Sequence, residues 1–229
     1  MKFHPIFPSI LVFAVSTFVL PLSGQEESVN PGINDSYQDP DPSTYVERFE
    51  REGREVYDNR RIIVEKLDLK PGMAVADVGC GTGLFTRLIA RDVGPESKVY
   101  AVDIAETFVN HTLFSSRARG LRNVEGVVCA PDDVRLPENS VDLVFICDTY
   151  HHFEFPQKTM SSIRRALRPG GRLVVLDFER IEGVSSDWIL GHVRAGKEVF
   201  RSEIEAAGFR LREELDLFEQ NYFLVFEEE

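Results

Sequence analysis

Three alternate glycines, preceded by an aspartate within an apolar run, form the strongest chemical signal in this sequence. The segment reads Val75-Ala76-Asp77-Val78-Gly79-Cys80-Gly81-Thr82-Gly83. Glycine lets the backbone approach a bound molecule closely, and the helix start expected after it offers N–H groups without partners inside the helix. Leu84 stands where the dinucleotide fingerprint Gly-x-Gly-x-x-Gly has its third glycine. The loop therefore departs from that fingerprint, and Asp77 indicates a ligand that carries an ammonium group.

Acidic residues follow this loop at two further places along the chain. Asp103 ends the next apolar run, where a carboxylate can accept hydrogen bonds from both hydroxyls of a ribose. Asp132 and Asp133 follow the run after that, where an oxygen could accept a hydrogen bond from an adenine amino group. A single aspartate fits a helix cap or a turn equally well. Together with Asp77, however, these positions match the amine, ribose and base of one adenosyl amino acid.

A pair of histidines ends a fourth apolar run, in Cys147-Asp148-Thr149-Tyr150-His151-His152-Phe153. An imidazole titrates near neutrality, so His151 or His152 could act as a general base, with Asp148 orienting either ring. The alternative is that one histidine packs on a bound ligand and the other is exposed, because adjacent side chains should not share one direction. Tyr150 could cover the face of a cationic ligand.

The segment 184–200 contains Trp188, His192, Arg194 and Lys197. His192 and Arg194 could bind an anionic group of a substrate, since arginine offers paired donors to a carboxylate. The alternative is a solvated basic helix face. The five histidines and three cysteines lack the spacing of a zinc site, so no metal is predicted.

Short β-rich runs alternate with helical segments after Pro71-Gly72, which indicates a parallel sheet built from βαβ units. A helix with a capping box at Thr44 and Glu47, and with a break expected near Gly53, precedes them. The strands are expected at 73–78, 98–103, 124–129, 141–147, 172–178, 209–217 and 222–226. The helices are expected at 84–93, 106–119, 156–167 and 201–207. The link 218–221 is so short that the last two strands must be antiparallel.

Length and charge limit the possible functions. The chain has 229 residues, enough for one α/β domain of ordinary size plus a tail. Its formal net charge of -12 comes from 38 acids and 26 bases, and a field of that sign repels nucleic acid and anionic lipid surfaces. We therefore expect a small-molecule partner and no nucleic acid. Nothing in the sequence predicts the oligomeric state.

The amino-terminal segment 1–24 has the shape of a signal peptide. Lys2 precedes a charge-free apolar run at 10–20, and the small residues Ser23 and Gly24 suggest cleavage before Gln25. The alternative is an uncleaved membrane anchor. Either predicts a periplasmic, secreted or membrane-anchored protein facing away from the cytosol, although a cytosolic location stays open. Residues 25–42 are polar and predict a disordered linker, and 43–229 form the folded domain.

These motifs resemble the class I S-adenosylmethionine-dependent methyltransferase family. Beyond the glycine loop, the resemblance rests on 99–103, 136–144 and 165–173, and it covers 45–226. It implies a Rossmann-like three-layer αβα sandwich. The implied sheet has seven mostly parallel strands in the order 3-2-1-4-5-7-6, with strand 7 antiparallel.

The resemblance also implies roles for individual residues. Asp77, Gly79, Cys80, Gly81 and Gly83 would line the methionine end of S-adenosylmethionine, Asp103 and Ile104 the ribose, Asp132 or Asp133 the adenine, and Asp148 the site near the methyl group. Many family members have Gly-Asp-Ala where this chain has Pro131-Asp132-Asp133, so which aspartate touches the base stays open. The 184–200 segment would cap the substrate pocket.

The sequence therefore predicts an enzyme that aligns a small acceptor for in-line attack on a sulfonium methyl group, without a metal. A base is needed only where the acceptor arrives protonated. The alternative is an exported binding module that keeps the fold without catalysis, which the export signal favours because the cofactor is made in the cytosol. A nicotinamide oxidoreductase is disfavoured by Leu84 and by the reversed last strand.

Overall fold

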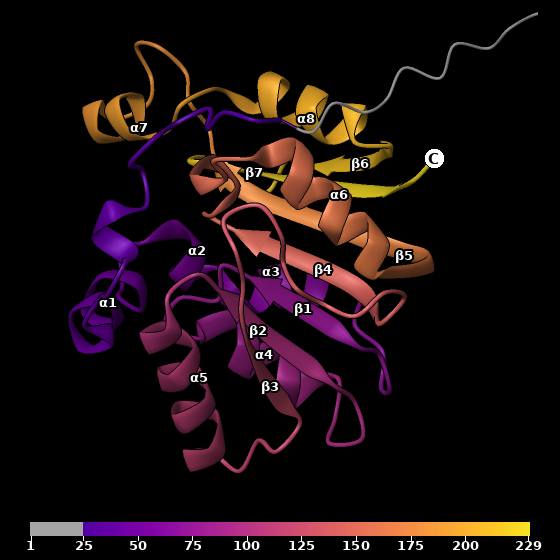
Figure 1. The fold of residues 1–229 in the computed structure, drawn as a ribbon. Helices are drawn as coiled ribbons and strands as arrows, with labels where there is room; N and C mark the ends of the chain where they lie inside the picture. Colours follow the sequence, from indigo (N-terminus) through magenta and orange to yellow (C-terminus); the bar gives the residue numbers. More distant parts are fainter. Residues whose placement is uncertain (1–24) are drawn as a thin grey trace, which may run out of the picture.

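A seven-stranded sheet organises the chain in the computed structural model, which describes residues 25–229 (Figure 1). The strand order is β3-β2-β1-β4-β5-β7-β6, and only β7 runs antiparallel to its neighbours β5 and β6. The strands are β1 (Val75–Val78), β2 (Val99–Asp103), β3 (Val124–Val128), β4 (Val141–Cys147), β5 (Leu167–Phe178), β6 (Phe209–Leu215) and β7 (Asn221–Glu228). The expected three-layer fold and strand order are confirmed. The predicted leader at 1–24 lies outside the described residues.

Helices cover both faces of this sheet. The helical segments are η1 (Asp35–Tyr37), α1 (Pro42–Phe49), α2 (Glu55–Asp58), α3 (Arg60–Lys66), α4 (Leu84–Asp92), α5 (Glu106–Ala118), η2 (Tyr150–His152), α6 (Pro156–Ala166), α7 (Asp187–His192) and α8 (Lys197–Ala206). Apolar side chains of α3 and α4 form one core with one sheet face, and those of α6 and α8 form a second core with the other face. The alternation of side chains along each strand produces these two cores.

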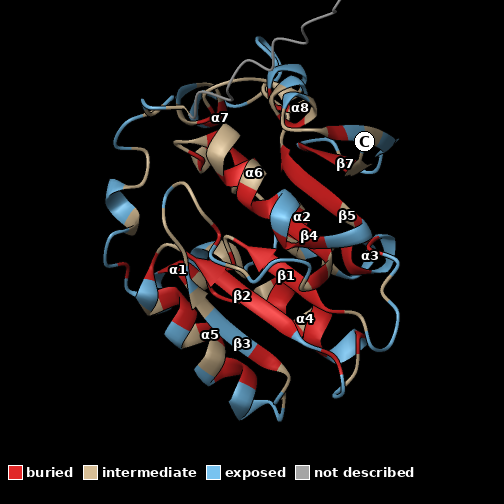
Figure 2. Cartoon of the chain, turned by 45° about the vertical axis from the view of Figure 1, so that its right-hand side comes forward, coloured by how far each residue is buried: buried red, intermediate tan, exposed pale blue. Residues whose placement is uncertain are grey.

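Burial decreases from the centre of the sheet to its edge (Figure 2). All residues of β1 and β2 are buried, whereas β3 at the edge has exposed residues along its length. The parallel strands β1, β2 and β4 all end at the same side of the sheet. Ligands of open α/β sheets bind beyond these carboxyl ends, so the fold itself indicates where to look for a site.

Several strand boundaries differ from those expected. β5 begins at Leu167 instead of 172, because Leu167 pairs with Val141 before a register shift in the ladder. β6 ends at Leu215, and β7 is longer than expected at both ends. The short link between β6 and β7 makes the antiparallel pair that the sequence predicts.

The segment 25–41 differs from the disordered linker expected. It contains η1 and lies against the folded domain, since the Val29 N–H donates to the Glu154 carbonyl (2.9 Å) and the Asn34 side-chain amide donates to the His152 carbonyl (3.1 Å). The ring of Tyr37 packs on Tyr45 with centroids 5.5 Å apart. The ring of Tyr37 and a few hydrogen bonds thus fix this segment against the folded domain, although its composition alone predicts disorder.

The first helix begins differently from the expected capping box. The Asp41 carboxylate accepts a hydrogen bond from the Ser43 N–H (3.0 Å), and Pro42 occupies the first helical position. The expected break is present, because α1 ends at Phe49 and Gly53 adopts a φ of +84°.

Within 25–229 no helix is long and apolar enough to cross a membrane. The thiols of Cys80, Cys129 and Cys147 are free.

Candidate functional site

A cavity of about 430 Å³ lies at the carboxyl ends of β1, β2 and β4. Its walls come from the glycine loop, from the residues after β4 and from α7, and the amino-terminal segments around Tyr37 and Phe49 close it. A volume of this size is typical of small-molecule sites.

The three glycines of the loop adopt backbone conformations that other residues rarely take. Gly79, Gly81 and Gly83 have φ angles of +77°, +49° and +81°. A Cβ atom on Gly79 would lie 2.2 Å from the side chain of Thr149, and one on Gly83 would lie 2.5 Å from Thr112. Gly79, Cys80 and Gly81 line the cavity, whereas Gly83 does not and instead begins α4 beside Thr112.

Asp77 and Asp103 are buried carboxylates that line the cavity. The Thr86 hydroxyl donates to Asp77 (2.5 Å), and the N–H groups of Gly81 and Ala105 each donate to Asp103 (2.9 Å). Burial raises the pKa of both carboxyls to about 6. Because their donors are neutral, both carboxylates would be stabilised by a cationic or hydroxyl-bearing ligand. Ile104 also lines the cavity.

Asp148 lines the cavity but does not orient a histidine, contrary to the sequence prediction. Its carboxylate accepts hydrogen bonds from the Arg54 guanidinium (2.5 Å) and from the Asn221 amide (2.7 Å). Burial raises the pKa of Asp148, and the Arg54 charge opposes that rise. Asp148 therefore ties α2 and β7 to the end of β4.

Asp132 and Asp133, which the resemblance places at the adenine, do not line the cavity. Asp133 pairs with Arg165 (3.0 Å), and Asp132 lies 3.5 Å from Lys158. Both carboxylates thus contact basic side chains of α6, and the backbone between Ala130 and Asp133 closes in an isolated bridge. The wall at this position consists of Cys129, Ala130 and Pro131.

His151 and His152 both line the cavity, with ring centroids 4.3 Å apart. The expectation that adjacent histidines point in different directions fails because both lie in the tight 3-10 turn η2. Asp177 orients His151: one carboxylate oxygen lies 2.7 Å from the ring Nδ1, and the other accepts from the His151 N–H (3.2 Å). Burial, followed by the charges of His151 and His192, lowers the pKa of His152 to about 2.

The substrate residues expected from the sequence divide into two groups. Trp188 and His192 line the cavity, and their rings stack with centroids 4.7 Å apart. Tyr150 is fully buried, and its hydroxyl contacts Glu203 (3.2 Å). Arg194 forms a paired contact with the same Glu203 (2.6 and 2.8 Å). Neither Tyr150 nor Arg194 lines the cavity, so both hold α8 in place instead of meeting a substrate.

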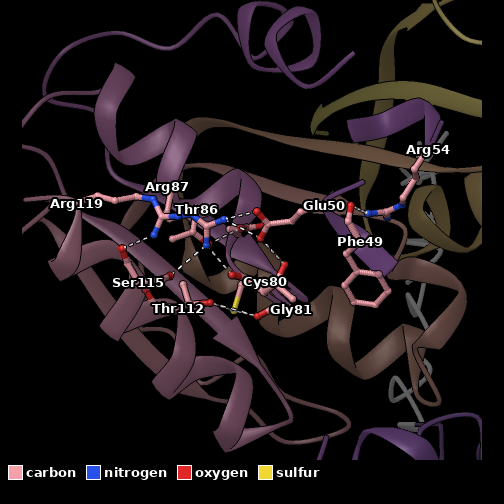
Figure 3. Close-up of polar contacts among 12 residues, drawn as sticks. Phe49, Glu50, Arg54, Cys80, Gly81, Thr86, Arg87, Thr112, Ser115 and Arg119 are labelled. Atoms are coloured by element: carbon pink, nitrogen blue, oxygen red, sulfur yellow. Dashed lines mark hydrogen bonds and ion pairs between the residues drawn. The ribbon is translucent and has the colours of Figure 1, made fainter. Parts of the chain in front are cut away.

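The sequence analysis missed an ion pair that holds α1 over the glycine loop (Figure 3). Both carboxylate oxygens of Glu50 contact Arg87 of α4 (2.7 Å each), and Glu50 also accepts from the Thr82 hydroxyl (2.8 Å). This contact places the neighbouring Phe49 beside Gly81, where its ring lines the cavity. No local pattern predicts this pair, because its partners lie 37 positions apart.

Asp177 also takes part in the site without having been predicted from the sequence. It lies at the end of β5, next to β4 in the sheet, and it is fully buried. A carboxylate within the apolar run Val174-Val175-Leu176-Asp177-Phe178 is the signal that could have found it, because such a group needs a buried partner.

Comparisons with known proteins agree with this geometry. Residues 76–175 match the family model described as "Methyltransferase domain". A ubiquinone/menaquinone biosynthesis C-methyltransferase, UbiE, of Hahella chejuensis is 32% identical over 123 residues, 53% of this chain and 49% of that protein. The chain therefore spans about half the length of this relative.

Two solved structures share the fold. A SAM-dependent methyltransferase from Aquifex aeolicus is 27% identical with a TM-score of 0.72, over 82% of this chain and 98% of that one. The [4+2]-cyclase SpnF is 25% identical with a TM-score of 0.62, over 72% of this chain and 63% of that one. The sheet order, the glycine loop and these matches together show that the chain carries a class I S-adenosylmethionine-dependent methyltransferase domain.

Proposed function

We propose that this protein transfers the methyl group of S-adenosylmethionine to a small, flat, largely apolar acceptor. The observation that carries the proposal is a single cavity with two chemically different ends. The glycine loop, Asp77 and Asp103 form one end, and aromatic and imidazole rings form the other. When bound, S-adenosylmethionine supplies an electrophilic methyl group on a sulfonium centre.

The first end fits the cofactor by charge and shape. Asp77 and Asp103 are buried acids whose hydrogen bonds come from neutral donors, so the ammonium group and ribose hydroxyls are the complement they lack. Gly79 and Gly81 line the cavity without side chains, so a ligand can approach their backbone closely. The wall of Cys129, Ala130 and Pro131 would contact the base through backbone and apolar atoms, since Asp132 and Asp133 point elsewhere.

The second end fits an acceptor with a ring. Phe178, Trp188, His151 and His192 surround it, with Phe178 and Trp188 edge to face at 5.5 Å. Aromatic walls favour a flat apolar molecule. Trp188 is 53% exposed, so this end is also the route by which an acceptor enters. The C-methyltransferase named above acts, according to its name, in the synthesis of quinones, which are molecules of this shape.

One imidazole is placed to receive a proton. Asp177 lies at Nδ1 of His151 and holds the tautomer that carries hydrogen there, which leaves Nε2 as an acceptor. Where the acceptor arrives with a hydroxyl, thiol or amine, Nε2 could take its proton as the methyl group is transferred. The remaining task of the protein is alignment.

Isothermal titration of the purified full chain with S-adenosylmethionine and S-adenosylhomocysteine tests the cofactor end. We expect binding by the unaltered chain and a loss of about 10- to 100-fold in Asp103→Ala, because charge-assisted hydrogen bonds to the ribose are removed. Asp132→Ala is the matched control, since that acid lies outside the cavity. Transfer of a labelled methyl group to quinols, phenols, thiols and amines then tests the reaction. Absence of binding, or equal binding by Asp103→Ala, would refute the proposal.

A further inference from the structure

Three histidines meet at the acceptor end of the cavity. His151 and His152 come from η2, and His192 comes from the last residue of α7, 40 positions further along the chain. One ring nitrogen of each lies within 4.8 Å of the other two. A general base requires only one of these imidazoles, so two of them have no part in the proton transfer considered above.

The spacing of the nitrogens matches metal coordination. The Nε2 atoms of His152 and His192 are 3.3 Å apart. Two nitrogens bound to one Zn²⁺ at about 2.0–2.1 Å with a tetrahedral angle lie about 3.3 Å from each other. The nitrogen of His151 lies within 4.8 Å of the other two, so it needs to approach them by up to about 1.5 Å, which small rotations of these side chains could supply.

Hydrogen bonds to the opposite ring nitrogens fix two of the three rings. Asp177 contacts Nδ1 of His151 (2.7 Å), and the Asn34 side-chain oxygen contacts Nδ1 of His152 (3.2 Å). Each contact leaves Nε2 free to face the cluster. A carboxylate or carbonyl oxygen behind a histidine ligand is the usual outer contact of a protein metal site, because it fixes the tautomer and makes the ligand more basic.

Aromatic rings pack against all three histidines of the cluster. Trp188 stacks on His192, Phe178 lies 5.6 Å from His151, and Tyr37 lies edge-on to His152 at 5.1 Å. The Asp177 carboxylate supplies a negative charge directly behind the cluster. A metal cation bound by the three neutral imidazoles would balance the negative charge of Asp177, which the imidazoles alone leave unbalanced.

We infer that His151, His152 and His192 bind one divalent transition-metal ion, with a fourth position open to the cavity. Three imidazoles suit Zn²⁺, Cu²⁺, Ni²⁺ or Co²⁺, whereas Mg²⁺ and Ca²⁺ prefer oxygen ligands. Three histidines with an open position are typical of catalytic zinc sites. The binding itself does not depend on the proposed methyl transfer.

The open position suggests a use that does rest on the proposed function. An oxygen, nitrogen or sulfur atom of the acceptor that binds the ion would have its pKa lowered, so that it loses its proton before attacking the methyl group. With its nitrogen bound to the ion, His151 cannot also act as the base considered above, so the proton goes to solvent. The acceptor atom keeps the electron pair that forms the new bond to carbon, and the sulfur of the donor keeps the pair of the bond that breaks. The cluster would thereby select acceptors that carry such a donor atom.

Competition between the metal-free full chain and a chromophoric chelator for Zn²⁺ tests the inference. We expect one tight site per chain and an increase of at least about 100-fold in the dissociation constant of His192→Ala. His111→Ala is the matched control, since His111 lies on α5 outside the cavity, and it should bind Zn²⁺ unchanged. Circular dichroism and cooperative unfolding report whether each variant is folded. Substitution with Co²⁺ should give the intense visible absorption of a four-coordinate ion.

A second variant keeps the three ligands and alters only the group behind them. Asp177→Asn should raise the dissociation constant for Zn²⁺ by about 10- to 100-fold. Failure of the unaltered chain to bind Zn²⁺, or binding that His192→Ala leaves unchanged, would overturn the inference and make the cluster a hydrogen-bonded imidazole group only. Zn²⁺ binding without methyl transfer would refute the proposed function alone, and methyl transfer without Zn²⁺ binding would refute this inference alone.

Discussion

Two buried acids control how the unliganded protein responds to pH. The pKa of Asp77 and of Asp103 is about 6 in the folded chain, above the ordinary value of 3.8, because burial disfavours their charged forms. An acid with a raised pKa binds protons more strongly when folded than when unfolded. The contribution of these two acids to the stability of the unliganded chain therefore falls as pH rises from about 4 to 6, and stays lower above that range.

Asp77→Asn removes the destabilisation that the buried, charged Asp77 carboxylate causes above pH 6. The amide oxygen can still accept the Thr86 hydroxyl, so we expect the free energy of unfolding at pH 7.5 to rise by about 1–3 kcal/mol, the equivalent of up to about two pKa units. Urea unfolding at pH 5 and pH 7.5 measures the gain. Asp132→Asn, at an acid 3.5 Å from its lysine, is the control and should change little. A loss of stability at pH 7.5 would contradict the argument.

Cofactor affinity should depend on pH in the opposite direction. The ammonium group and ribose hydroxyls bind the charged carboxylates, so the association constant for S-adenosylhomocysteine should rise between pH 5 and pH 7 and then level off. Titration calorimetry across this range measures the dependence. Asp77→Asn should reduce this dependence and leave the part that belongs to Asp103. An unchanged profile in Asp77→Asn would show that Asp77 does not meet the ligand.

The ion pair between Glu50 and Arg87 acts at the level of elements, because it holds the end of α1 against the glycine loop. The side chain of Arg87 is 8% exposed and that of Glu50 is 15% exposed. Glu50→Ala leaves a buried guanidinium without its partner, so we expect a loss of about 2–4 kcal/mol in unfolding free energy and weaker cofactor binding as Phe49 moves. Arg210→Ala, which breaks the more exposed pair with Glu227, should cost less than about 1 kcal/mol. Equal losses in thermal or urea unfolding would contradict this assignment.

Local sequence patterns are sufficient for the sheet and for half of the site. The strand order that the resemblance implies is confirmed, and the short final link by itself predicts the antiparallel last pair. Gly79, Asp77 and Asp103 line the cavity as expected, since the ends of neighbouring parallel strands must meet. The contact of Asp177 with His151 and that of His192 with His152 cannot be predicted from local patterns, because they join β5, η2 and α7 and depend on how these elements pack. The expected place of Asp132 in the cavity wall is not found, because a turn of four residues can direct a side chain toward the cavity or away from it.

At the scale of the whole molecule, the amino-terminal segment belongs to the site. Asn34 contacts His152, Tyr37 lines the cavity, and Gln25 donates to the Glu154 carbonyl (3.0 Å). A variant that begins at residue 42 should therefore bind Zn²⁺ and S-adenosylhomocysteine more weakly than one that begins at Gln25. Calorimetry on the two chains measures the difference, and equal affinities would show that 25–41 only rests on the surface.

Localisation remains a proposal that the sequence of residues 1–24 supports. We propose that the protein is exported and that cleavage leaves Gln25 as the first residue. Cell fractionation followed by amino-terminal sequencing of the purified protein tests this. A cytosolic chain that still begins at Met1 would refute it, and would remove the conflict with a methyl donor made inside the cell.

The position of β7 sets the order in which the sheet can be completed. β7 follows β6 along the chain but inserts between β5 and β6, so during translation the nascent β5 leaves the ribosome with its outer edge unpaired. That edge carries Leu173, Val174, Val175 and Leu176, all fully buried in the finished domain. Until β7 is synthesised, the exposed apolar edge of β5 can pair with strands of other chains. A chaperone that binds unfolded segments would prevent such pairing by covering this edge.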